Sequence, residues 1–106
     1  DPAMHDLINY KLLEHYNVLI DKSIVDTEKA FSSLQDKSNT VKSLLDKDKF
    51  TNFENTLLNI SDHLKELHFE KNRLVKELKN IDIKLEKHLR NEERVFDKTK
   101  YVSLER

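Results

Sequence analysis

Between positions 50 and 102, large apolar residues recur at alternating intervals of three and four. This spacing places their side chains on one narrow stripe of an α-helix, and such a stripe must be covered by another helix. Ten of the first eleven stripe positions are large and apolar in a chain that is only 37% hydrophobic, and Lys71 is the exception. Further along, His88 and Glu92 interrupt the apolar run. We therefore predict an assembly seam made of Phe50, Phe53, Leu57, Ile60, Leu64, Leu67, Leu74, Leu78, Ile81 and Leu85.

The positions that flank this seam are unusually apolar in the C-terminal half of the chain. Val75, Leu89 and Phe96 stand where a two-stranded parallel coiled coil normally places charged residues. An in-register parallel pair of helices would also bring Glu77 against Asp82, which is repulsive. The widened face therefore favours an antiparallel arrangement, or a bundle of three or four helices.

A second helical pattern covers residues 5–45 and is broader than a coiled-coil stripe. One row contains Ile8, Leu12 and Leu19, and the other begins at Tyr10 and continues at the same alternating spacing to Leu45. A helix with so broad an apolar face usually contacts two or more neighbouring helices. The predicted face of this helix consists of Ile8, Leu12, Leu13, Leu19, Ile20, Ile24, Phe31 and Leu34.

Asn17 interrupts the second of these rows. A polar residue at such a position sets the register of a coiled coil at some expense of stability. The simpler interpretation, which we favour, is that Asn17 lies at the edge of the wide face and contacts water.

The two patterns do not share one phase. If the spacing of residues 5–45 continued beyond Leu45, it would place Asp48 and Asn52 in the core, whereas the later seam uses Phe50 and Phe53. Residues 36–51 are also rich in Ser, Asp, Asn and Thr, which weaken helices. Thr51 and Glu54 have the spacing of a helix-starting capping box, and Asp48 is a second candidate cap.

The two patterns and the break between them are compatible with two all-α architectures. A hairpin has a helix at about 5–45, a junction at about 36–51 and a long helix at about 51–104. The alternative is one continuous distorted helix of ~150 Å. We favour the hairpin, assembled as a dimeric helical bundle.

Composition supports long helices and excludes several kinds of site. The chain of 106 residues has no Gly, no Cys and a single Pro at position 2, so it has few means of turning sharply and forms no disulfide. Its 19 basic and 20 acidic residues are interleaved, which is typical of a solvated helix surface and not of nucleic-acid binding. Without Gly there is no Gly-rich phosphate loop, and no apolar run reaches the ~18–20 residues that a membrane span needs. We expect an intracellular protein, cytoplasmic or nuclear, in which Asp1–Met4 is a remnant of an expression vector.

The five histidines are the only candidates for chemistry. His88 and Glu92 are one helical turn apart, a spacing that two metal ligands can have, but they do not match the paired Glu-x-x-His pattern of di-iron bundles. His88 can also be a pH-sensitive element of the seam or an edge residue that simply tolerates His. No nucleophile, base and acid form a recognisable set. We therefore predict no metal, no cofactor and no enzymatic activity.

The leading functional hypothesis is a non-enzymatic assembly module. It is a coiled-coil segment through which a larger intracellular scaffold protein oligomerises, first with itself as a dimer and also with other proteins. Chains of this composition are frequent in cytoskeletal and chromosome-segregation scaffolds. The alternative is one half of a heteromeric helical complex whose partner faces the imperfect positions Lys71, His88 and Glu92. In a third hypothesis, residues 5–25 bind a membrane surface. This segment lacks the cluster of Lys and Arg that is expected on the polar face of such a helix.

Overall fold

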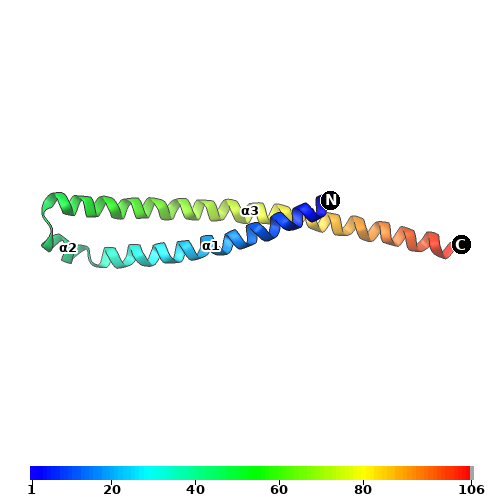
Figure 1. Cartoon of the computed structure of the whole chain (residues 1–106), viewed down its shortest axis with the longest axis horizontal. Helices are drawn as coiled ribbons and strands as arrows, with labels where there is room; N and C mark the ends of the chain where they lie inside the picture. Colours follow the sequence, from blue (N-terminus) through cyan, green and yellow to red (C-terminus); the bar gives the residue numbers. More distant parts are fainter. Residues whose placement is uncertain (106) are drawn as a thin grey trace. The chain divides into compact units, whose positions relative to one another are not determined.

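The computed structural model describes the backbone of residues 1–105 and the side chains of residues 1–92. Over that range the chain forms three helices and no strand (Figure 1). They are α1 (Pro2–Asp36), α2 (Ser38–Leu44) and α3 (Lys47–Glu105). The all-α prediction is therefore confirmed. Phe96, predicted to widen the seam, lies outside the described side chains.

The chain divides into two compact units, and both α1 and α3 contribute to each. The terminal unit contains Asp1–His15 together with the part of α3 from Leu74 onward. The turn unit contains Tyr16–Arg73, and therefore the end of α1, all of α2 and the start of α3.

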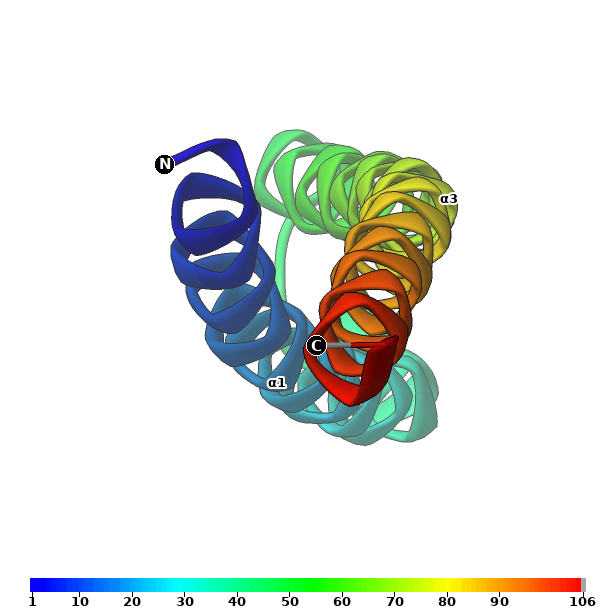
Figure 2. The same cartoon turned by 90° about the vertical axis from the view of Figure 1, so that its right-hand side faces the viewer.

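The reversal of the chain lies in the turn unit. The helix is interrupted first at Lys37 and again at Leu45 and Asp46, where the backbone of Leu45 is extended with φ −103° and ψ 149°. The link between α2 and α3 crosses from one helix to the other, as the end-on view also shows (Figure 2). No residue of the described backbone has a positive φ, so the chain reverses through the extended Leu45 without the left-handed conformation that Gly supplies in many other proteins. The hairpin is confirmed, and the continuous helix is wrong.

The start of α3 differs from the predicted one. Asp46 is the N-cap, because its Oδ1 accepts a hydrogen bond of 2.9 Å from the backbone N–H of Lys49. Both candidate caps named from the sequence are wrong. Asp48 lies in the first turn of α3, and the hydroxyl of Thr51 donates to the carbonyl of Lys47 at 2.9 Å, inside the helix. The helix starts earlier because the extended Leu45 immediately precedes Asp46, the first residue able to cap it.

The first turn of α1 includes residues 2–4, which we expected to belong to a vector remnant. Asp1 caps it by accepting a hydrogen bond of 3.0 Å at Oδ1 from the backbone N–H of Ala3. Pro2 takes the first helical position, where its fixed φ and missing N–H are well tolerated. Residues 2–4 therefore extend, toward the N-terminus, the helix that the pattern predicted from residue 5.

The core of each unit lies where α1 faces α3. In the turn unit Ile20 and Ile24 are buried, and in the terminal unit Leu74 and Ile81 are buried. All ten predicted seam residues are buried or half-buried. On α1 the less exposed positions follow the second apolar row, with Leu13, Phe31 and Leu34 half-buried. The seam of α3 is therefore covered by the second row of α1 within one chain.

Candidate assembly surface

Helix α1 carries large apolar side chains that the hairpin leaves in solvent. In the terminal unit, Ile8 is 53% and Leu12 is 64% exposed, and Met4 and Leu7 are also exposed. The turn unit likewise exposes four such side chains of α1, namely Tyr16, Val18, Leu19 and Val25. The predicted face of α1 therefore divides in two. Ile8, Leu12 and Leu19 are exposed, and the other five residues of that face are buried or half-buried.

In the terminal unit the exposed and covered residues of α1 lie on opposite sides of the helix. Each residue advances by 100°, so Ile8 points about 140–160° and Leu12 about 100–160° away from the covered positions Asp6, Tyr10 and Leu13. A helix with two apolar sides is suited to contact two neighbours, of which α3 is one.

Helix α3 adds apolar side chains to the exposed surface of the terminal unit. Val75 and Leu89, predicted to widen the seam, are 46% and 60% exposed. Leu89 and Leu85 on α3, with Leu7 and Met4 on α1, line a groove of about 290 Å³. Val75 and Leu89 are therefore left open to solvent by α1.

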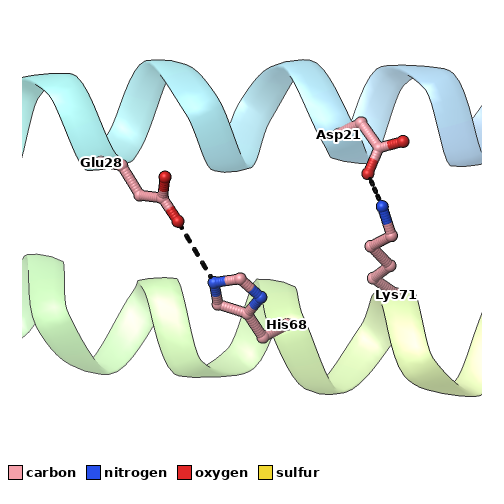
Figure 3. A network of polar contacts seen from close by, with 4 residues as sticks. All are labelled: Asp21, Glu28, His68 and Lys71. Carbon is pink, nitrogen blue, oxygen red and sulfur yellow. Dashed lines mark hydrogen bonds and ion pairs between the residues drawn. The ribbon is translucent and has the colours of Figure 1, made fainter.

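In the turn unit, one edge of the hairpin is closed by polar contacts between the helices. Asp21 of α1 forms an ion pair with Lys71 of α3, and His68 Nε2 lies 3.4 Å from Glu28 Oε1 (Figure 3). Lys71 is the polar exception in the predicted seam, and Figure 3 shows its side chain reaching toward α1. Residue numbers rise along α1 as they fall along α3, so the two helices are antiparallel.

A groove of about 460 Å³ also opens between the helices of the turn unit. Short side chains dominate its lining on both helices. His63 is at its border, with Nδ1 3.8 Å from Glu66 Oε2 one turn later on α3. The groove is lined by Asp26, Thr27, Ala30, Thr56, Asn59, Ile60 and His63. Nothing in the sequence pattern pointed to it, because Ala30 and the threonines carry no hydrophobic signal.

Asn17 is half-buried, and its Oδ1 atom is shielded from solvent without a hydrogen-bond partner among the described residues. The interpretation that Asn17 contacts water at the edge of the face is therefore wrong for this oxygen. The role in setting the register stays a prediction. An unpaired buried carbonyl is destabilising, so Asn17 weakens the hairpin.

In the terminal unit, the partner of His88 comes from α1. Its Nε2 lies 3.2 Å from Asp6 Oδ2, and the Asp6 side chain is only 19% exposed. His88 is therefore in contact with a carboxylate of the facing helix. Its spacing to Glu92 along α3 was not predicted to be a metal site. Among the side chains of residues 1–92, no three His, Asp or Glu residues come together as metal ligands would.

The Glu70 carboxyl on α3 has a lowered pKa. Arg73 donates hydrogen bonds to Glu70, from Nε at 3.1 Å and also from Nη2, and these bonds lower the pKa of Glu70 below its ordinary value. The pair is exposed and three residues apart on one helix face, as expected for a solvated surface.

No protein family, curated protein or solved structure compared with this chain matches it. Along residues 1–105, none of the helices combines the length and the low polarity that crossing a bilayer requires. Helix α1 exposes large apolar side chains in both units.

Proposed function

We propose that this chain is a non-enzymatic assembly module, a helical hairpin through which a larger intracellular scaffold protein self-associates, first as a dimer. The supporting observation is that α1 is covered by α3 on one side and exposes Ile8 and Leu12 on the other. Scattered exposed apolar residues are ordinary, but a row of them opposite a packed seam is typical of a helix that packs on two sides.

The energetics call for several of these side chains to be buried together. Complete burial of an Ile or Leu side chain contributes about 1.5–3 kcal/mol, and these side chains are already half-covered, so about 1 kcal/mol remains for each. Association of two chains costs roughly 4–15 kcal/mol in lost freedom of motion. One or two contacts are therefore insufficient. A stable dimer needs the four exposed apolar side chains of α1 in the terminal unit, Met4, Leu7, Ile8 and Leu12, to be buried together.

The structure also bears on the heteromeric alternative. That hypothesis depends on imperfect seam positions that face a foreign partner. Lys71 and His88 instead face Asp21 and Asp6 of the same chain. Because their partners are internal, these two positions no longer favour a heteromer over self-association.

The test is the double variant Ile8→Glu with Leu12→Glu. Its side chains are exposed in the hairpin, so helicity by circular dichroism is expected to stay near that of the wild type. The mass by sedimentation equilibrium is expected to fall to that of a monomer, because a dimer interface cannot bury unpaired carboxylates.

The matched control is Phe69→Glu, which replaces an apolar side chain that is 73% exposed on α3. It is expected to keep the wild-type mass. The proposal fails if the Ile8 and Leu12 variant assembles as the wild type does.

A further inference from the structure

The two edges of the turn unit are built differently. At one edge, Asp21 and Glu28 on α1 extend to Lys71 and His68 on α3 and bridge the helices (Figure 3). The groove at Ala30 has no bridging pair among the residues that line it. In a coiled coil such an edge is normally covered by the aliphatic parts of long charged side chains, and the methyl group of Ala30 is too short to cover it.

The groove resembles the holes of knobs-into-holes packing, each of which accepts one side chain of another helix. On α1 it is lined by Thr27 and Ala30, and on α3 by Thr56, Asn59 and Ile60. Only Ile60 among these five is a large apolar residue. A hole bordered by residues of two helices accepts an apolar knob from a third helix, as in helical bundles.

Each helix carries a carboxylate in or next to the lining of this groove. Asp26 belongs to its lining on α1, and Glu66 follows His63 by one turn on α3. The matching occupant is a helix with an apolar residue between two basic ones. Charge complementarity of this kind selects partners and their orientation.

The chain itself carries such a helix surface in the turn unit. Val25 of α1 is 46% exposed, and Lys22 and Lys29 are three residues before it and four residues after it. In a helix these spacings put one lysine a turn away on each side of Val25. Both lysines are exposed.

We propose that the groove at Ala30 receives Val25 of a second copy of this chain, with Lys22 and Lys29 of that copy next to Asp26 and Glu66. This inference rests on the proposed self-association and names two of its contact surfaces. Because the two surfaces differ, the contact is heterologous. A dimer formed through it keeps one groove and one Val25 free, and further chains can then add to it as an open row or a closed ring.

The test uses two variants that each remove one surface. Ala30→Arg fills the groove with a cation, and Val25→Glu combined with Lys22→Glu reverses the surface that enters it. Each variant alone is expected to weaken self-association about tenfold or more in sedimentation velocity, because like charges then meet across the contact. An equimolar mixture is expected to form a one-to-one complex, since each variant supplies the surface that the other lacks.

Ser33→Arg is the matched control, because it adds the same charge to an exposed position of α1 outside the groove. It is expected to assemble as the wild type does. A charge swap keeps the test independent of steric effects at Ala30. Asp26→Lys is expected to weaken assembly, and Lys22→Asp added to it is expected to restore assembly.

Two results would overturn the inference while self-association stands. One is an Ala30→Arg variant that assembles like the wild type while Ile8→Glu with Leu12→Glu is monomeric. The other is a mixture of the two surface variants that forms no complex. A wild-type chain that is a helical monomer at every concentration would overturn the proposed function as well.

Discussion

Lys71 of α3 is ion-paired with Asp21 of α1, fifty residues earlier in the chain (Figure 3). Lys71 occupies a seam position whose neighbours along the seam are Leu67 and Leu74, so its cation needs a carboxylate from the facing helix. The two side chains are 34% and 46% exposed, and ion pairs in such surroundings contribute little to stability. We infer that this pair fixes which turn of α1 faces which turn of α3.

A double-mutant cycle measures this pair. Asp21→Asn and Lys71→Met are each expected to lower the free energy of unfolding slightly, with a coupling energy of about 0.2–1 kcal/mol. The double variant is expected to be as stable as the wild type or more stable, because an apolar residue fits the seam better than a cation. Urea unfolding followed by circular dichroism gives all four values. A coupling several times larger would show that the pair contributes mainly to stability.

The seam assignment can be tested by comparing Leu74 with its neighbour Val75, because the two side chains differ strongly in burial. Leu74 is fully buried, whereas Val75 is 46% exposed. Leu74→Ala is expected to lower the free energy of unfolding by about 2–5 kcal/mol through lost burial and the remaining cavity. Val75→Ala is expected to change it by less than about 0.5 kcal/mol. Equal effects in urea unfolding would contradict the seam assignment.

The sequence predicted the helices and the seam well because both depend on local periodicity. Phe50, Leu64 and Leu78 are placed on one side of a helix by their spacing alone, and the structure covers that side. The break after Leu45 was predicted from the change of phase. Leu12 was predicted to lie on an apolar face, but spacing cannot say which row of a two-sided helix α3 covers.

The contacts between helices were beyond reach of the sequence because they depend on the register of α1 against α3. The pairs of Asp6 with His88 and of Glu28 with His68 join residues 82 and 40 positions apart. Nothing local in either segment marks them. The cap at Asp46 was missed for a different reason, since the capping-box spacing of Thr51 and Glu54 looked stronger than a single Asp.

Asn17 is expected to reduce the stability of the hairpin. Asn17→Leu removes a shielded carbonyl oxygen that has no hydrogen-bond partner among the described residues. It is therefore expected to raise the free energy of unfolding by about 1–3 kcal/mol. Thermal unfolding checks the direction of the change. A lower melting temperature for Asn17→Leu would mean that the oxygen is satisfied in solution.

The N-cap of α3 can be tested against the one that the sequence suggested. Asp46→Ala removes the acceptor for the backbone N–H of Lys49 and is expected to lower the free energy of unfolding by about 1 kcal/mol. Thr51→Ala is expected to have a smaller effect, because its hydroxyl bonds to a carbonyl inside the helix. Urea unfolding of both variants decides between Asp46 and Thr51 as the cap.

The Glu70 carboxylate gives a prediction for pH. Its pKa is lowered in the folded chain, chiefly by the hydrogen bond from Arg73. The small stabilisation is therefore present above the pKa of the unfolded chain and is lost as the pH falls through the lowered folded value. Arg73→Gln is expected to move the pKa of Glu70 back up toward its ordinary value. NMR titration of the Glu70 side chain measures this shift, and an unchanged value would rule out Arg73 as its cause.

The most direct test of the assembly account is sedimentation equilibrium of the wild-type chain over a wide range of concentrations, with helicity measured on the same samples. The account predicts a highly helical species whose mass rises with concentration above the 12.6 kDa of one chain, toward a dimer first. A chain that stays at 12.6 kDa at every concentration while keeping its full helicity would contradict it.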